Sequence, residues 1–482
     1  MLFNSLEFAV FFPVVCVLYF IAPYRWQTGI LLIASCVFYM AFIPHYILIL
    51  FATIVIDYFA GLYLEKVQGR PRTIILWVSI IATCAILFVF KYFYFFAGVL
   101  AEIANALGYP ASDPILRFVL PIGLSFHTFQ SLSYVIEVYR GHQKAEKSFV
   151  VYATYVMFFP QLVAGPIERP QNLLHQFHEE HRFDYRLIAG GLKLMAWGFF
   201  KKLVIADRLA LYVNDIFSSP SQYNGLQLSL GTVFFAYQIY CDFSGYSDIA
   251  RGSARILGFE LMKNFNDPYA SSSISEFWRR WHISLSTWFR DYIYIPLGGS
   301  RSGGLKKCRN LIITFTISGL WHGAAWTYVV WGFLNGIYLV FESFTQTARD
   351  RFFSALGVSR ESAFRLAIRT VSTFLLTCIG WVVFRSQSLS DGWYILTHFY
   401  KDWHFGAIST PQFLLRQMPI AIGAVCFLEL AQAIVRWKAF SSTIRQLHMA
   451  HYLVRFAGYS IVVVIVIMFG VYRSNQFIYF QF

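Results

Sequence analysis

Charged side chains are scarce in this sequence. Asp, Glu, Lys and Arg together make up 13% of the 482 residues, whereas 57% are hydrophobic, and the mean hydropathy is +0.53. A water-soluble surface needs far more polar side chains, so this composition excludes a soluble globular protein. Apolar runs of roughly 18 residues or more, each able to cross a lipid core about 30 Å thick as a helix, recur along the chain. We therefore expect one all-α polytopic membrane domain over residues 1–482.

The sequence also lacks the short motifs of several large enzyme classes. It contains no GxSxG, P-loop or GxGxxG pattern, so a serine hydrolase, an ATP-driven pump and a dinucleotide enzyme lose support. Its seven cysteines form no CxxC pair. The segment HQFHEEHR resembles a metal cluster, but it is not HExxH and its outer histidines would point apart on a helix. No metal site and no bound cofactor are predicted.

The net charge of +14 comes from Lys and Arg residues in short loops between apolar runs. That placement is typical of topology signals and not of a nucleic-acid surface. Basic residues recur in alternate loops, after the first, third and fifth apolar runs, which places those loops in the cytoplasm. The same rule makes the loop with Arg349, Arg360, Arg365 and Arg369 cytoplasmic. Both termini, including the tail 473–482, are then expected outside.

Hydropathy predicts roughly eleven membrane spans. The apolar stretches lie near residues 8–22, 28–43, 47–64, 74–97, 115–137, 149–164, 187–205, 226–241, 310–345, 367–384, 411–435 and 453–472. Pro160 and the Gly165-Pro166 pair make a re-entrant segment at 149–164 as plausible as a span. Residues 274–295 hold five charged side chains and cannot cross lipid unaided, so we expect an amphipathic helix that lies in the interface or is tucked into the bundle.

The run from 310 to 341 contains no formal charge, yet His322 stands near its middle. An ionisable group at that depth needs a partner or a cavity, so a functional histidine and a hydrogen-bonded core histidine remain open. His282 shares an aromatic helix face with Trp278, and a core role is at least as plausible as catalysis. Asp242 could orient an imidazole or fix a helix end, and a structural or supporting role is favoured.

Several segments together resemble one family. They are FFPQLVAGPIERP, GFFKKLVIADRL, YCDFSGYSDIARGSARILGF, NFNDPYASSSISEFWRRWHISLSTWFRDYIYIPLGGSR and LWHGAAWTYVVWG. They look like the membrane-bound O-acyltransferases (MBOAT), in particular the bacterial branch of alginate O-acetylation membrane proteins. The resemblance implies a ring of helices around a central funnel, with acetyl-CoA entering from the cytoplasm as acyl donor.

The resemblance also implies roles for individual residues. His322 corresponds to the catalytic histidine of the family and His282 to its second motif histidine. Asp242, Trp321, Asn266 and Asn335 would line the substrate tunnel or support it. The branch usually has Phe and His where this chain has His127 and Asn335, and the role of His127 is left open.

The terminal FIYFQF matches the FxYxxF tail of relatives that export acyl groups. It implies that the Tyr479 hydroxyl is acylated first and that an extracytoplasmic partner protein then moves the group to a polysaccharide such as alginate. The expected location is the bacterial inner membrane. Three alternatives stay open: peptidoglycan as the acceptor, a non-enzymatic transporter or flippase, and an aromatic tail that only anchors in the membrane interface.

Overall fold

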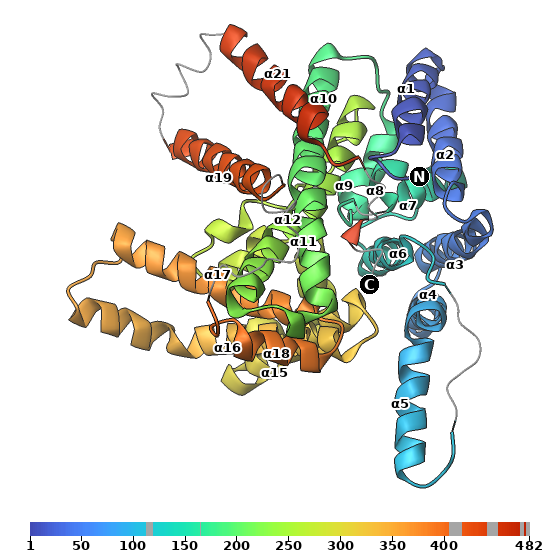
Figure 1. Ribbon diagram of the computed structural model, residues 1–482. Helices are drawn as coiled ribbons and strands as arrows, with labels where there is room; N and C mark the ends of the chain where they lie inside the picture. The colour runs from blue at the N-terminus through green and yellow to red at the C-terminus, as the bar shows by residue number, and fades with distance from the viewer. Residues whose placement is uncertain (112–118, 164, 404–416, 441–451, 473–476, 479–482) are drawn as a thin grey trace. The chain divides into compact units, whose positions relative to one another are not determined.

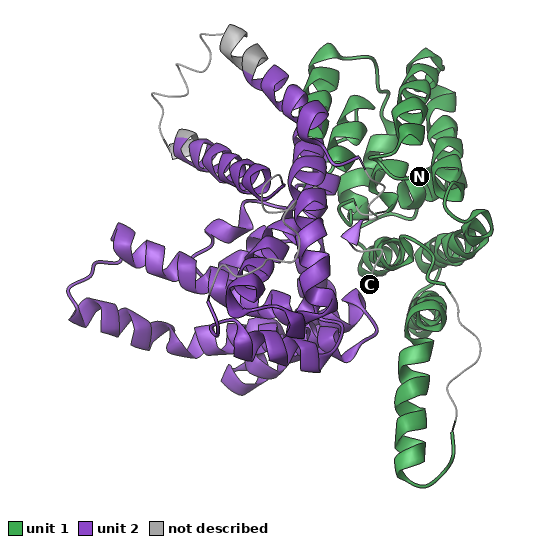
Figure 2. Cartoon of the chain, in the orientation of Figure 1, with its two compact units in different colours: residues 1–195, 249–262, 482 green, residues 196–248, 263–481 purple. Residues whose placement is uncertain are grey.

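The computed structural model describes the chain except for residues 112–118, 164, 404–416, 441–451, 473–476 and 479–482. Throughout the described part, helices are the only regular secondary structure (Figure 1). Helices satisfy their backbone polar groups internally, as lipid requires, and the all-α class is confirmed. The chain divides into two compact units (Figure 2). Unit 1 holds residues 1–195, 249–262 and 482, and unit 2 holds residues 196–248 and 263–481.

Among its described residues, unit 1 contains ten α-helices, the last of them in part, and the last turns of α12. Its helices are α1 (Leu6–Ile21), α2 (Tyr24–Met40), η1 (Pro44–Tyr46), α3 (Ile47–Lys66), α4 (Arg70–Leu87), η2 (Phe88–Tyr92), α5 (Phe93–Ala106), α6 (Leu124–Arg140), α7 (Phe149–Met157), α8 (Phe159–Leu162), α9 (Pro170–Leu173), η3 (Leu174–His178) and most of α10 (Tyr185–Phe199). Gly123 and Gly141 bound α6 with φ of 77° and 78°, a left-handed backbone that favours glycine. These two glycines explain why α6 begins and ends where it does.

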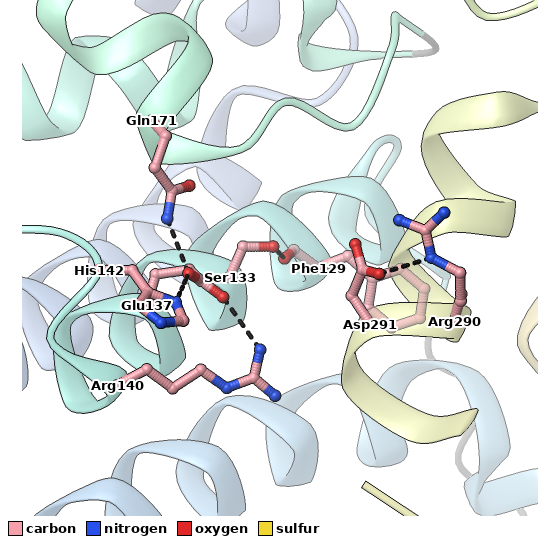
Figure 3. Close-up of polar contacts among 8 residues, drawn as sticks. All are labelled: Phe129, Ser133, Glu137, Arg140, His142, Gln171, Arg290 and Asp291. Carbon is pink, nitrogen blue, oxygen red and sulfur yellow. Dashed lines mark hydrogen bonds and ion pairs between the residues drawn. The ribbon is translucent and has the colours of Figure 1, made fainter. Parts of the chain in front are cut away.

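A buried carboxylate fastens the end of α6. Glu137 Oε1 accepts a hydrogen bond from Arg140 Nη1 at 3.1 Å (Figure 3). Its Oε2 accepts from Gln171 Nε2 of α9 at 2.7 Å and lies 2.9 Å from His142 Nδ1. A buried carboxylate is tolerated when such donors surround it. Glu137 therefore ties α6 to α9 within unit 1.

The stretch 149–164 does not form one spanning helix. It folds as α7, which is nine residues long, and α8, which is four residues long. Nine residues rise only about 14 Å, less than half of the lipid core. Pro160 stands in the first turn of α8, where its missing N–H is tolerated, and both helices are buried within unit 1 from Val151 onward.

Unit 2 contains the remaining elements. They are η4 (Phe200–Ala206), α11 (Asp207–Ser218), η5 (Pro220–Gln222), α12 (Gly225–Ile256), η6 (Pro268–Ala270), α13 (Ile274–Arg280), α14 (Ile283–Phe289), η7 (Arg290–Tyr294), η8 (Gly299–Ser302), α15 (Gly304–His322), α16 (Trp326–Ala355), α17 (Ala363–Arg385), α18 (Leu389–His398), α19 (Met418–Phe440) and α21 (Tyr452–Phe469). The helix α12 continues well past the expected apolar run 226–241. Its second half carries Asp242 and Asp248.

By length and composition, four helices of the described part could each cross a membrane: Pro44–Lys66, Arg70–Ala106, Ala363–Arg385 and Met418–Trp437. Shorter apolar helices lie at Leu6–Ile21 and Gly458–Phe469. A multi-pass membrane protein is thus confirmed, whereas the expected count of roughly eleven spans is supported only roughly. Several apolar runs are broken by the fold, which hydropathy alone does not detect.

The run 310–345 is one such case, because it forms a helical hairpin. The helix α15 ends at His322, the chain turns through Gly323, and α16 packs back against α15 (Figure 1). A Cβ on Gly319 would lie 2.2 Å from the Tyr328 carbonyl oxygen and 3.0 Å from Gly332 Cα. Small residues at this crossing let the two backbones approach closely.

The expected amphipathic helix over 274–295 is also broken. It begins at Ile274, where the Ser273 hydroxyl accepts a hydrogen bond from the Glu276 N–H as an N-cap, and α13 ends at Arg280. His282 then adopts a left-handed backbone with φ of 42°, and α14 starts at the next residue. A non-glycine residue in this conformation is uncommon and marks a position that its surroundings hold in place.

Candidate active site

The first candidate residue, His322, is the last residue of α15 and is only 4% exposed. Its imidazole lies among aromatic rings, with centroid distances of 5.0 Å to Trp321, 5.1 Å to Trp331 and 5.4 Å to Phe384. Gly323 follows directly, and a Cβ there would lie 2.1 Å from the Tyr328 ring. The hairpin turn thus needs a glycine next to the histidine, and the aromatic rings fix where the imidazole lies.

The second candidate, His282, is fully buried between α13 and α14. The Ser284 N–H donates to Asn264 Oδ1 at 3.1 Å, which identifies that oxygen as an acceptor. His282 Nδ1 lies 3.2 Å from the same oxygen, so we assign the proton to Nδ1 and a lone pair to Nε2. Burial lowers the pKa of His282 to about 3, which keeps the imidazole neutral.

One indole joins the two histidines. The Trp321 ring centroid lies 6.4 Å from that of His282 and 5.0 Å from that of His322, and Trp321 is itself 4% exposed. The fold of unit 2 therefore brings residues 40 positions apart into one aromatic cluster. Their spacing in the sequence alone does not predict this proximity.

The C-terminal tail reaches the same cluster. Phe477 and Ile478 are 1% and 2% exposed. The Phe477 ring lies 4.8 Å from Tyr246 and 5.5 Å from Phe243, centroid to centroid. Phe243 in turn packs edge-on against His282 at 4.5 Å. Phe477 thus contacts Phe243, which in turn contacts the motif histidine His282. Tyr479 itself lies outside the described residues.

Asp242 anchors the tail, and neither of its oxygens binds an imidazole of the described residues. Its Oδ2 accepts a hydrogen bond from the Ile478 backbone N–H at 2.8 Å, and its Oδ1 pairs with the Lys202 ammonium. Lys202 also pairs with Asp207 at 2.9 Å, and all three charged side chains are at most 4% exposed. A buried ammonium between two carboxylates offsets part of the cost of desolvating all three charges.

Lys201 and Lys202 were missed as individual site residues, although they stand in the quoted GFFKKLV segment. Both are buried in the π-helical turn η4, a feature frequent at functional sites. Lys201 donates to Asp248 at 2.7 Å and to the Ser244 hydroxyl at 3.0 Å. Two adjacent lysines inside the apolar stretch 187–205 were the available signal, because charges in such a run are costly unless they are paired.

The remaining candidate residues are Asn335, Asn266 and His127. Asn335 is buried on α16 and donates to the Trp331 carbonyl at 2.8 Å, so it supports the helix beside His322. Asn266 is exposed and accepts from Lys263 at 2.6 Å, and the place next to His282 belongs to Asn264. His127 lies in unit 1, buried on α6 against the Thr53 hydroxyl.

Comparison with known proteins identifies the family. Residues 79–381 match the model of the membrane-bound O-acyltransferase family. The probable alginate O-acetylase AlgI of Pseudomonas aeruginosa is 40% identical over 82% of this chain and 74% of its own length, and that of Azotobacter vinelandii is 38% identical over 86% and 81%. A peptidoglycan O-acetyltransferase of Helicobacter pylori is 33% identical over 76% and 72%. The chain belongs to the membrane-bound O-acyltransferase family, in its AlgI-type branch, and is a multi-pass membrane acyltransferase.

Proposed function

We propose that this acyltransferase moves an acetyl group from acetyl-CoA to the hydroxyl of its own Tyr479, with His322 as general base. A partner protein outside the membrane then transfers the group from Tyr479 to a polysaccharide. The location that fits these steps is the bacterial inner membrane, with the donor in the cytoplasm and the tail on the outer side.

The burial of the tail is the observation that carries this proposal. Phe477 and Ile478 are packed against Phe243, Tyr246 and Asp242, and Phe243 touches His282. An aromatic tail that only anchored in the membrane interface would expose its rings to lipid headgroups. The packing of Phe477 and Ile478 near His282 favours a tail that presents the next residue, Tyr479, to the site.

The chemistry is that of a general base acting on a weak nucleophile. A tyrosine hydroxyl has an ordinary pKa near 10, so it needs a base to attack at neutral pH. His322 takes the phenolic proton as the tyrosine oxygen bonds to the thioester carbonyl carbon. The carbon–sulfur bond then breaks, the proton passes from the imidazolium to the leaving thiolate, and the products are acetyl-tyrosine and free CoA. His282, held by Asn264, positions Trp321 and Phe243 around the site.

The acceptor polymer is proposed from the relatives. The alginate O-acetylases are more similar to this chain than the peptidoglycan O-acetyltransferase is. We therefore favour an exopolysaccharide such as alginate, with peptidoglycan as the second candidate. The partner protein, and not this chain, would select the polymer.

Two separate substitutions test the proposal. His322→Ala removes the base, and Tyr479→Phe removes only the acylated oxygen while it keeps the ring. Both variants should lose ester-linked acetate from the cell-surface polymer, measured after mild alkaline release. Wild-type acetate levels in the His322 variant would refute the catalytic role. Wild-type levels in the Tyr479 variant would refute the relay and leave direct transfer by the enzyme.

A further inference from the structure

Unit 2 contains a cavity of about 470 Å³ that is rich in arginine. The arginines that line it come from α13, from the end of α16, from the loop that follows α16 and from the first turns of α17: Arg279, Arg349, Arg360, Arg365 and Arg369. Two carboxylates, Glu342 and Asp350, also line the cavity, so three positive charges are in excess.

The carboxylates are already engaged. The Glu342 carboxylate accepts hydrogen bonds from the backbone N–H groups of Ile274 at 2.7 Å and Ser275 at 3.3 Å. Asp350 is shared by Arg365 and by Arg360 at 3.1 Å. Across the described residues, no carboxylate pairs with Arg279, Arg349 or Arg369. The excess positive charge is therefore available to a ligand.

Arg365 gives the clearest sign of an anionic ligand. Its side chain is 3% exposed and lies over the Phe353 ring at 4.9 Å. One nitrogen pairs with Asp350, but Nε and Nη1 are buried without a hydrogen-bond partner anywhere in the described chain. Buried unpaired donors are costly, and phosphate oxygens would satisfy them through charge-assisted hydrogen bonds. Basic residues that served only as topology signals would not need to converge on a cavity in this way.

A neighbouring cavity extends from the arginines toward the end of α15 that carries His322. It measures about 540 Å³, is lined mainly by apolar side chains, and shares Ser275 and Arg279 with the arginine cavity. Its wall includes Ser318, which stands one turn before His322 on the same face of α15. Its Trp278 packs against Trp331 at 5.8 Å, and Trp331 borders His322.

We infer that the arginine cavity binds the phosphate groups of the acyl donor, and that the apolar cavity takes the uncharged arm whose thioester reaches His322. CoA has this division, with a phosphate-rich nucleotide at one end and a thiol at the end of a long neutral arm. The inference rests on the proposed donor. The headgroup of an anionic phospholipid has the same phosphate chemistry and is the competing occupant.

Measurements of ligand binding in the absence of acetyl transfer test this assignment. The full-length protein is purified into phosphatidylcholine nanodiscs, and the affinities for labelled CoA and for pantetheine, which lacks the phosphates, are measured by equilibrium dialysis. Arg349→Gln and Arg360→Gln alter exposed side chains, so the fold should tolerate them. Each should weaken CoA binding about tenfold or more, as expected for a lost charge-assisted hydrogen bond, and leave pantetheine binding unchanged.

Arg182→Gln is the matched control, because Arg182 is an exposed arginine of unit 1 that pairs with Glu180 and does not line the arginine cavity. It should bind CoA like the wild type. Equal CoA affinity in wild type, Arg349→Gln and Arg360→Gln would overturn the inference. A second arm measures thermal unfolding of the same three proteins in nanodiscs with phosphatidylglycerol. Stabilisation of the wild type alone by this lipid, together with equal CoA affinity in all three proteins, would assign the cavity to a lipid headgroup and overturn the donor site.

Different results would refute the proposed function and the donor site. His322→Ala should bind CoA with wild-type affinity, since the inference assigns binding to the arginines and chemistry to the imidazole. Arginine-dependent CoA binding without any acetyl transfer would refute the proposed function and support the donor site. Acetyl transfer, with CoA binding that does not depend on the arginines, would refute the donor site and support the proposed function.

Discussion

Removal of the Phe477 ring should disconnect the tail from the active site. Phe477 is 1% exposed, so Phe477→Ala loses nearly all of the burial of one aromatic ring, worth about 1.5–3 kcal/mol. An undocked tail could still place residual apolar surface in the membrane interface, so the lower end of this energy range applies. A loss of about 1.5 kcal/mol lowers the docking equilibrium constant roughly tenfold, and the rate of acyl transfer to the tail falls by up to that factor.

The assay is a single turnover with labelled acetyl-CoA and purified full-length protein, followed by the label that becomes attached to the chain. Phe477→Leu keeps most of the apolar surface and should stay within about threefold of the wild type. Phe344→Ala removes a ring that is 65% exposed on α16 and should have no effect. Transfer at the wild-type rate in Phe477→Ala would refute the idea that the buried tail segment positions the acceptor.

Three further results are expected. Gly323→Ala should abolish activity or folding, because its Cβ would lie 2.1 Å from the Tyr328 ring, whereas Gly304→Ala, with nothing within 4 Å, should behave like the wild type in activity and thermal unfolding. Lys202→Met should destabilise the protein by about 3–5 kcal/mol, because it leaves Asp242 and Asp207 buried without their ammonium partner. The midpoint of thermal unfolding should be lower than in the wild type, and an unchanged midpoint would contradict the role given to these ion pairs. The pKa of His282 is about 3 in the folded protein and near 6.5 in the unfolded chain, so only the unfolded chain binds a proton there between these pH values. The free energy of unfolding should therefore fall by about 2 kcal/mol from pH 7 to pH 5. His282→Gln should reduce that pH dependence.

Much of the fold class follows from local sequence. The low charge content and the long apolar runs predict a helical membrane protein, and that is confirmed by the helices and by the family match. His322 could be singled out because a lone ionisable residue in an uncharged run needs an explanation. The motifs around it identify the acyltransferase family, which the comparisons confirm.

The details of the site depend on contacts that local sequence does not contain. Hydropathy treats 310–345 as one apolar run, and only the close packing of Gly319 on Gly332 shows why it folds back. The helical spacing over 274–295 gives no sign of the left-handed backbone at His282, because tertiary contacts hold that conformation.

The asparagine partner of His282 shows the same limit. Asn264 and Asn266 stand two residues apart in NFN, and only the fold decides which of them meets the imidazole. The link from Asp242 to Ile478 spans 236 positions and is invisible to any local pattern.

The central claim is that the chain acylates its own tail. The most direct measurement incubates the purified full-length protein with isotope-labelled acetyl-CoA and examines its C-terminal peptide by mass spectrometry, with release of free CoA measured in parallel. The account predicts one labelled acetyl ester on Tyr479, one equivalent of free CoA per ester, and neither product in His322→Ala. An unmodified Tyr479 in wild-type protein that still acetylates the polymer would contradict it, and movement of substrate without any release of CoA would indicate a transporter.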